Sequence, residues 1–394
     1  MATPLAGVTA PGELPRGFEA LRVPTASEVA AAVDLLQPTA QTGVQPGQAA
    51  SQTRPVLVLD LETSGLGSTI VPFIAVAAWH DGDRVVLDQW TLHDPMAERD
   101  FLAAFFMCLD TELQPGTRLL SYNGSSFDLP RLRARARRLH LAWDSDPRAT
   151  APSLAAVHLD LVLPARRVLK QSLPNCRLCT MESSLLGLTR RGDMSGMEIA
   201  ELWSRMVATP GLADALGGGP DAEAKADALD PFLREDIAAA QRHNRADVWA
   251  LFCVATTLAK RISAPQSVVE AIGVARHRRH SGLPEQALAA LEPFLVRAPA
   301  RGRARGSDWI DAAMLAADVH RAAGRHDDAS GLWERICDLA PGHVAAHEAL
   351  AKHLEHRVRR PDLALAVARA SLAPCDKRLA RLEKKTQARR AKQA

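Results

Sequence analysis

The sequence contains no apolar run long enough to cross a membrane, and it carries little net charge. None of its 394 residues belongs to a stretch approaching the roughly 18 apolar residues that a membrane helix needs, so no membrane contact is expected. A formal net charge of +3 gives no global field for attracting nucleic acid, so any basic surface has to be local. The first residues lack the basic start and apolar run of a signal peptide, and the six cysteines are expected to be mostly free thiols. These absences favour a cytoplasmic protein.

The composition and the chain length predict two folded units with tails. Hydrophobic residues make up 47% of the sequence, which is enough for at least one sizeable core. Residues 1–54 are rich in Ala, Pro, Thr, Gln and Gly. Apart from the helix-like segment Ala26–Gln37, they are expected to form a largely disordered leader.

Residues 55–262 show the order of elements of an α/β domain. The run VLVLDLE predicts a buried strand, and two further apolar runs separated by the turn DGD complete a meander of three strands. Helices are predicted at 98–113 and 127–141, on either side of a strand at 117–124, and a further strand is expected at 155–163. Elements in this order predict a mixed sheet covered by helices.

Residues 264–373 are expected to be all helical, with a recurring form. An Ala-rich helix, a Gly turn, an acidic residue and a second helix follow one another, a pattern similar to tetratricopeptide repeats. In such repeats each helix pair leaves an apolar face that only its neighbour covers. A helical bundle without repeat symmetry is the alternative. Residues 374–394 are strongly basic, which predicts a solvated tail rather than a packed helix.

Two acids stand at the end of the first predicted strand. Side chains two apart on a strand project to the same face, so Asp60 and Glu62 form a pair of carboxylates. Burying such a pair is costly unless a cation compensates it, and hydrolysis of a phosphodiester uses two divalent cations about 3.5–4 Å apart. The turn from Thr63 to Leu66 is made of small residues beside which a nucleotide can approach the backbone. Taken alone, D-x-E in a strand is a common and mostly structural pattern.

Two later segments supply further candidate residues. In SYNGSSFDLP, Asp128 stands at the start of a predicted helix, where it is either a ligand or the helix N-cap. The Asn123 amide is placed to hold a nucleotide or the loop, and the Phe127 ring to pack under the site or against a base. In QRHNRADV, His243 and Asp247 share a helix face, which suits either a general base beside a metal site or a surface ion pair.

Together these three segments resemble the motifs of the DEDD exonuclease superfamily. The more specific resemblance is to the YprB-type ribonuclease-H-like domain, a bacterial family of predicted nucleases that often carries tetratricopeptide-like repeats. The likeness continues in VHLDLVLPARRVLK, LPNCRLCTMESSLLGL and RRGDMSG, and it covers residues 55–262. It implies an α/β ribonuclease-H-like fold, a nucleic-acid substrate (DNA or RNA) and a site for two Mg²⁺ or Mn²⁺ ions, which prefer oxygen ligands.

The same resemblance assigns roles to individual residues. It implies metal ligands at Asp60, Glu62, Asp128 and Asp247, with His243 as the general base. It implies substrate contacts at Thr63, Leu66, Asn123, Phe127 and Asn244. In the familiar exonucleases the base is a Tyr four residues before the last Asp or a His five before it. Here a His stands four before Asp247, so the sequence departs from both patterns at the base, and Ser64 replaces the Thr of many relatives.

Several other polar residues are candidates with structural alternatives. Cys176 and Cys179 form a C-x-x-C pair without a second pair, so a zinc site is not favoured. Asp160 is expected to orient His158 or Arg166 rather than to bind a metal. The basic residues that are candidates for phosphate contacts, or for a solvated face, are Arg131, Arg133, Arg135, Arg137, Arg138, Arg166, Arg167, Lys170 and Arg177.

These features predict a metal-dependent nuclease, specifically a 3′–5′ exonuclease acting on single-stranded or frayed DNA or RNA. The alternative is a catalytically weak or inactive nucleic-acid-binding or scaffold protein whose helical repeats recruit a protein partner. The presence of all four carboxylates favours the nuclease.

Overall fold

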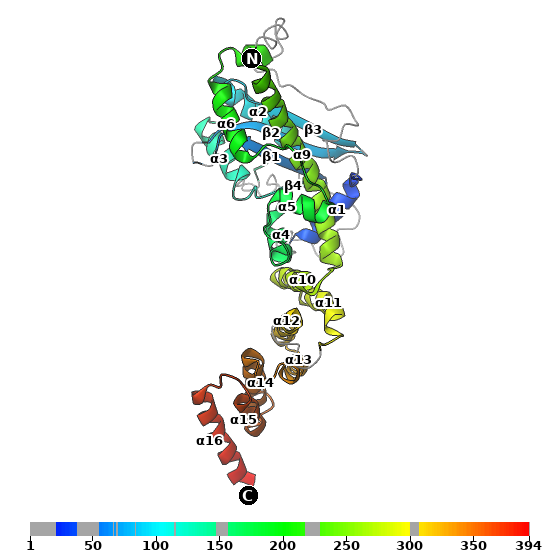
Figure 1. The fold of residues 1–394 in the computed structure, drawn as a ribbon, viewed down its shortest axis with the longest axis vertical. Coiled ribbons are helices and arrows are strands. Elements are labelled where there is room, and N and C mark those ends of the chain that lie inside the picture. Colours follow the sequence, from blue (N-terminus) through cyan, green and yellow to red (C-terminus); the bar gives the residue numbers. More distant parts are fainter. Residues whose placement is uncertain are drawn as a thin grey trace. The chain divides into compact units, whose positions relative to one another are not determined.

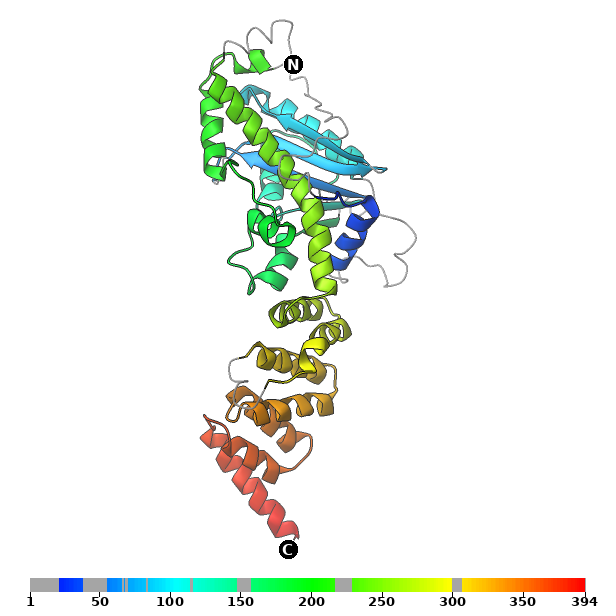
Figure 2. The ribbon, with the colours of Figure 1, turned by 45° about the vertical axis from the view of Figure 1, so that its right-hand side comes forward.

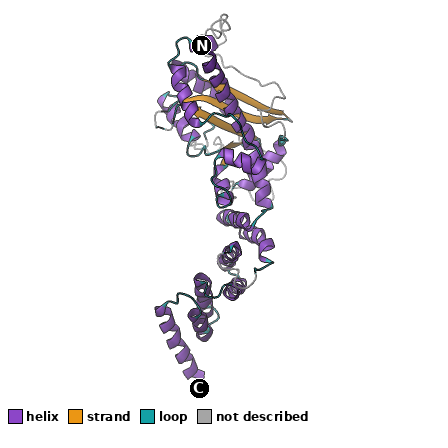
Figure 3. Cartoon of the chain, viewed as in Figure 1, coloured by secondary structure: helices purple, strands orange, loops and turns teal. Residues whose placement is uncertain are grey.

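The chain divides into two compact units, of which one contains a sheet and the other is helical (Figure 3). The structure is a computed structural model that describes residues 21–37, 55–65, 67, 70–82, 84–113, 116–146, 157–216, 229–299 and 307–393. The described residues of the first unit run to 166 and from 175 to 260. The second unit comprises 167–174 and the described residues from 261 onward.

A five-stranded sheet forms the centre of the first unit. Its strands lie in the order β3-β2-β1-β4-β5, with β1–β2 and β2–β3 antiparallel and β1–β4 and β4–β5 parallel. The bounds are β1 Val56–Thr63, β2 Pro72–Asp81, β3 Arg84–Thr91, β4 Arg118–Ser121 and β5 Val157–Asp160. The predicted meander and mixed sheet are therefore confirmed, and the acid-bearing strand β1 lies in the middle.

The two faces of β1 have different neighbours because its side chains alternate. Leu57, Leu59 and Leu61 are buried in a core that includes Phe105 and Leu102 of α2 (Glu98–Glu112). Asp60 and Glu62 project to the other face. The 33-residue helix α9, Pro231–Ser263, runs across the sheet in both views (Figures 1 and 2).

Shorter helices complete the first unit around the sheet. Helix α3 follows β4 directly, and α6 packs against β1. Their bounds, with those of the remaining short elements, are η2 Pro95–Ala97, α3 Asp128–Arg138, α4 Val162–Leu169, α5 Leu178–Met181, the π-helical turn η3 Glu182–Leu186, α6 Gly196–Val207 and α7 Leu212–Leu216.

The helix expected near residue 26 is present and packed. Helix α1, Ala26–Leu36, begins with a capping box in which Thr25 and Glu28 satisfy each other's backbone amides. Val29, Val33 and Leu36 are fully buried, and α1 contacts β1. This stretch therefore belongs to the folded unit and not to a disordered leader. The rest of the predicted leader, 1–20 and 38–54, lies outside the described residues.

The second unit is built of consecutive helices, each packed against the next. Neighbouring helices pair from α10–α11 through α14–α15, and each pair buries small apolar residues against the following helix. The bounds are α10 Val268–His280, α11 Pro284–Leu295, α12 Asp308–Ala322, α13 His326–Leu339, α14 Val344–His356 and α15 Pro361–Arg369. The predicted all-helical organisation is confirmed. Its assignment to tetratricopeptide repeats stays a prediction.

The prediction of a solvated basic tail at residues 374–394 is wrong for most of its length. Residues Asp376–Gln393 form helix α16, which packs against α15. Leu382 is fully buried beside Ala364 and Ala368. Glu355 of α14, whose side chain is fully buried, pairs with cations of α16. The buried Leu382 and the ion pairs with the buried Glu355 therefore hold this basic helix against its neighbours.

Candidate active site

The four predicted carboxylates lie close enough to perturb one another. Burial and then the charges of Asp247, Glu62 and Asp128 raise the pKa of Asp60 well above its usual range. Burial and the charges of Asp247 and Asp128 do the same to the pKa of Glu62. The structure thus brings together residues from β1, α3 and α9 that are up to 187 positions apart in sequence.

A buried amide pair holds Asp60 in place. The Nδ2 of Asn244 donates to Oδ2 of Asp60 at 2.7 Å, and Asn244 is itself fully buried. Its Oδ1 accepts from Nε2 of Gln89 on β3 at 3.0 Å, and the same Nε2 lies 2.9 Å from the Gln241 carbonyl. The amide of Asn244 thus holds Asp60 from a buried position, and its predicted contact with substrate stays a prediction.

Asp128 is the first residue of α3 and is 4% exposed. Phe127, not Asp128, occupies the N-cap position, and it makes no side-chain cap. The alternative that Asp128 serves as the cap is therefore wrong. Burial raises the pKa of Asp128 to about 7, and the charge of Asp160 adds to the rise. A carboxylate this enclosed needs a cation or a proton.

The loop before Asp128 is shaped by its backbone. Asn123 has φ 66°, and a Cβ on Gly124 would lie 2.2 Å from Oγ of Ser121, so only glycine fits there. Asp160 on β5 accepts from the backbone N–H groups of Asn123 and Ser125 at 2.6 and 3.0 Å. Asp160 thus supports the loop through these amides, and its predicted role in orienting His158 or Arg166 stays a prediction.

His243 bridges the carboxylates to a residue that the sequence did not single out. Its Nδ1 lies 2.8 Å from Oδ1 of Asp193, and its Nε2 lies 3.7 Å from Oε1 of Glu62 and 3.8 Å from Oδ2 of Asp247. Burial alone would lower the pKa of His243. The hydrogen bond to Asp193 and the charges of Asp247 and Asp193 outweigh burial and raise it.

Arg190 is a second residue without a predicted role. Its Nη1 lies 2.6 Å from Oδ1 of Asp247, and its guanidinium also pairs with Glu182, whose side chain is 2% exposed. The neighbouring acids outweigh burial and raise the pKa of Arg190. Arg190 and Asp193 both lie in RRGDMSG, which was known only as part of the family likeness. The only sequence signal for these two residues was an arginine three positions before an aspartate in a segment that contains glycine.

The remaining predicted substrate residues lie around the site with local partners. Thr63 is 8% exposed, and its hydroxyl donates to the Gly65 carbonyl at 3.0 Å. The Asn123 side chain accepts from the Ser126 hydroxyl at 2.7 Å. The guanidinium of Arg131 lies over the Phe127 ring at 3.6 Å, so this face of the ring already has a partner. Leu66 lies outside the described residues.

The arginines of α3 do not form a single phosphate-binding stripe. Arg133 pairs with Asp146 at 2.6 Å, and Arg135 pairs with Glu98, with both partners largely buried. These two side chains are structural. Arg137 and Arg138 are both exposed, and they stay candidates for phosphate contacts on this helix.

The four carboxylates are chemically suited to bind divalent cations, but in this structure Asn244 and Arg190 contact two of them. Carboxylate oxygens are the ligands that Mg²⁺ and Mn²⁺ prefer, and burial of mutually repelling acids favours a cation among them. Within the described part of the chain, however, no three His, Cys, Asp or Glu side chains are already arranged as ligands of one ion. Asn244 donates to Oδ2 of Asp60 and Arg190 pairs with Oδ1 of Asp247, so each of these carboxylates keeps its other oxygen for a metal.

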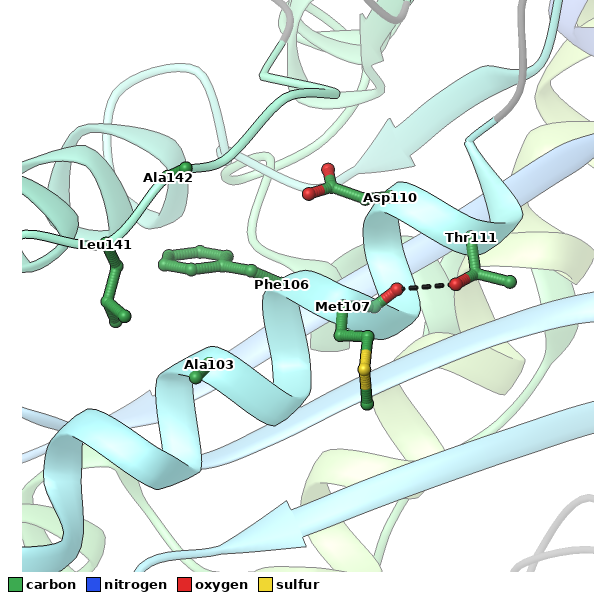
Figure 4. A pocket seen from close by; sticks show the side chains of 7 residues that line it. All are labelled: Ala103, Phe106, Met107, Asp110, Thr111, Leu141 and Ala142. Carbon is green, nitrogen blue, oxygen red and sulfur yellow. Dashed lines mark hydrogen bonds between the residues drawn. The ribbon is translucent and has the colours of Figure 1, made fainter.

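A hollow of about 530 Å³ on α2 lies apart from this chemistry. It is lined by Phe106, Met107 and Leu141, with Asp110 as its charged residue (Figure 4). Asp110 accepts from the backbone N–H groups of Ser145 and Asp144 at 2.8 and 3.3 Å, so it holds a loop. None of the four carboxylates lines this hollow.

The sheet order and the site define a nuclease-type fold, and comparison with known proteins agrees. A model of the RNase_H superfamily matches residues 57–259, just over half of the chain. The chain therefore belongs to the RNase_H superfamily. It is also similar to the uncharacterised protein YprB of Bacillus subtilis (strain 168), with 27% identity over 324 residues that cover 80% of this chain and 68% of YprB. The predicted family is thus confirmed.

Two solved structures share a more distant likeness. The product-bound structure of exonuclease I has a TM-score of 0.28 at 16% identity, covering 85% of this chain and 98% of that chain. The family B DNA polymerase from the hyperthermophilic archaeon Pyrobaculum calidifontis has a TM-score of 0.38 at 15% identity. That match covers 61% of this chain and 29% of the polymerase. Neither likeness is close enough to bear on mechanism. None of the described helices is both long and apolar enough to span a membrane.

Proposed function

We propose that this protein is a divalent-metal-dependent nuclease that removes nucleotides from the 3′ end of single-stranded or frayed nucleic acid. The observation that carries the proposal is the cluster of Asp60, Glu62 and Asp128 beside Asp247, in which Glu62 and Asp128 are buried, Asp60 is half-buried and each of the three has a raised pKa. Uncompensated acids of this kind are costly to fold around and therefore mark functional sites. Membership of the RNase_H superfamily makes phosphodiester hydrolysis the chemistry to expect of them.

The four carboxylates are the residues that would hold two Mg²⁺ or Mn²⁺ ions. Such ions, when bound, acidify a water and neutralise charge on the phosphate. Asp60 and Glu62 would provide ligand oxygens from one face of β1. Asp128 would provide them from the start of α3, and Asp247 from α9. Asn244 fixes Asp60 in one rotamer, which keeps that ligand in position before any ion arrives.

His243 is the residue placed to take the proton from the attacking water. Its Nε2 faces Glu62 and Asp247, and Asp193 engages Nδ1, so a neutral ring with its proton on Nδ1 leaves Nε2 as the acceptor. As the water oxygen bonds to phosphorus, the bond to the 3′ oxygen of the preceding nucleotide breaks and that oxygen takes up a proton from solvent. The terminal nucleotide leaves as a nucleoside monophosphate.

One contact favours the alternative of a catalytically weak nucleic-acid-binding or scaffold protein. Arg190 already neutralises Asp247 at 2.6 Å, so the protein has its own cation where a ligand carboxylate is needed. That neutralised charge weakens the attraction of the site for a metal. Calorimetric titration with Mn²⁺ separates the two functions, because only the nuclease requires saturable binding that Asp60→Ala weakens.

The activity test uses 20-nucleotide DNA and RNA strands labelled at either end, with added Mn²⁺. A 3′–5′ exonuclease shortens 5′-labelled strands stepwise and releases the label of 3′-labelled strands as a mononucleotide. The variant Asp60→Ala with Asp247→Ala is expected to lose activity by a factor of about 10³ or more. Glu235→Ala, an exposed acid on the same helix as Asp247, is the matched control. Equal activity of the double variant and the wild type contradicts the proposal.

A further inference from the structure

Basic side chains line the seam between α14 and α16 in the second unit, which the proposed nuclease chemistry does not use (Figure 1). On α16, Arg381, Lys385 and Arg389 follow one another at intervals of four, so they form one row with a cation about every 6 Å along the helix axis. Arg381 and Lys385 pair with Glu355 of α14 at 2.8 and 2.7 Å. Arg389 donates to the backbone carbonyl of Arg359, in the turn that follows α14. The row therefore lies against the end of α14 and this turn.

Arg359 occupies a backbone position that favours glycine. It has φ 58° and stands directly before the N-cap residue of α15. Gly282 and Gly324 hold the same place before α11 and α13, with φ 74° and 79°. Glycine adopts left-handed backbone without strain, whereas a bulky side chain does not. The Arg359 side chain is exposed and has no ion-pair or hydrogen-bond partner among the described residues, so no contact within them offsets the strain. Strained residues of this kind mark functional positions.

The cations of this seam outnumber the acid among them. The half-exposed and exposed cations are Arg357, Arg359, Arg381, Lys385 and Arg389, and we name them the α14–α16 basic row. Glu355 is the acid that they surround, and its side chain is fully buried. Although Arg381 and Lys385 pair with it, their side chains remain 49% and 47% exposed. The surface of the row is therefore strongly positive.

Other acids of α14, α15 and α16 do not neutralise the basic row. Three of them have separate cations: Asp362 pairs with Arg360, Glu383 with Arg369, and Glu348 with both Lys352 and Arg378. Asp376 begins α16, at the opposite end of the helix from Arg389. An anion from outside these helices is needed to balance the row.

From these observations we propose that the α14–α16 basic row binds the phosphate backbone of a nucleic-acid strand, as a second binding surface in addition to the carboxylate site. A strand presents a regular series of phosphates, which suits cations at a regular spacing, and guanidinium groups bind phosphate oxygens in pairs. Contacts to phosphates alone carry no sequence preference. The choice of nucleic acid as the anion rests on the proposed function.

An acidic segment of a protein fits the basic row less well. Protein interfaces surround their arginine anchors with apolar side chains that become buried. The turn at residues 357–360 offers one large apolar side chain for this purpose, Val358, which is 47% exposed. The remaining side chains of this turn are arginines, as expected of a surface that holds phosphates.

The test measures binding of a fluorescein-labelled 20-nucleotide poly-dT strand to the full chain by anisotropy, in EDTA so that no metal-dependent cleavage occurs. The triple variant Arg357→Ala, Arg359→Gly and Arg389→Ala is expected to bind about tenfold or more weakly. It should also lower the slope of log affinity against log salt concentration by about two, as loss of three phosphate contacts requires. The matched control removes three exposed arginines elsewhere in the second unit and should bind within about twofold of the wild type: Arg276→Ala, Arg297→Ala and Arg321→Ala.

Arg359→Gly alone separates loss of binding from loss of folding. Because it relieves a strained backbone, its Tm should be at least that of the wild type, while its affinity for the strand falls by about threefold. Unchanged binding by the triple variant or an equal loss in the control would overturn the proposal. So would tighter binding of an eight-residue poly-Glu peptide than of the strand. A strand that binds in EDTA but is not cut after Mn²⁺ is added supports the basic row and contradicts the proposed nuclease alone.

Discussion

The Nδ1 of His243 lies 2.8 Å from Oδ1 of Asp193, and this contact fixes which ring nitrogen faces the carboxylates. The two residues are 50 positions apart, and only the fold joins them. A hydrogen-bonded carboxylate on one side of an imidazole selects the tautomer and the orientation of the ring. Asp193 is therefore a positioning residue for the candidate base.

Asp193→Asn is expected to lower kcat by about tenfold to a hundredfold while leaving Mn²⁺ affinity unchanged. An amide does not favour the tautomer that the carboxylate selects. Calorimetry and steady-state rates on the same preparation check this. A parallel loss of metal affinity would show instead that Asp193 supports the carboxylates.

Asp193→Asn should also shift the pH dependence of the reaction rate in a defined direction. A base works when neutral, so the rate should rise as pH rises through the pKa of His243. Burial opposes protonation of His243, but its hydrogen bond to Asp193 and the nearby acids raise that pKa. Removing the Asp193 charge lowers the pKa, so the acidic limb of the rate profile should move to lower pH. A limb that stays in place contradicts His243 as the titrating base.

Arg190→Gln should destabilise the first unit by about 2–4 kcal/mol, because it leaves the buried Glu182 without its cation. Urea unfolding followed by tryptophan fluorescence measures this. Arg205→Gln breaks the exposed pair with Asp236 and should cost no more than about 1 kcal/mol. Similar effects of both substitutions would mean that the Arg190 network contributes little.

The second unit offers a stability test with a defined pH window. Burial would raise the pKa of Glu355, but hydrogen bonds from Arg381 and Lys385 outweigh it and lower the pKa to about 2. A lowered folded-state pKa stabilises above the unfolded value, and this contribution fades as pH falls from about 4.5 toward 2. Glu355→Gln should therefore cost about 1–3 kcal/mol at pH 6 and less at pH 3. Glu292→Gln, an exposed acid on α11, is the control.

The sequence predicted the elements and the carboxylates, because their signals are local. Apolar runs and helical spacing located the sheet strands and most helices, and the D-x-E pattern placed Asp60 and Glu62 on one strand face. The packed basic helix α16 was not predicted, because its packing depends on Leu382 and on an ion pair with Glu355 of another helix.

The supporting residues of the site were harder to predict, for a physical reason. The role of Asn244 in holding Asp60 was not predicted, because its amide lies between Gln89 and Asp60, and Gln89 is 155 positions away. Arg190 and Asp193 contact α9 only after the chain folds back on it. Contacts of this kind have no periodicity, so the sequence does not show which distant residues they join.

The most direct test of the metal site is anomalous diffraction from crystals soaked with Mn²⁺ and a nucleoside monophosphate. The account predicts Mn²⁺ peaks at about 2.0–2.3 Å from oxygens of Asp60 and Glu62, with the other oxygen of Asp247 joining them. The phosphate should lie against the ions and beside Nε2 of His243. Absence of any peak at these carboxylates would contradict the account.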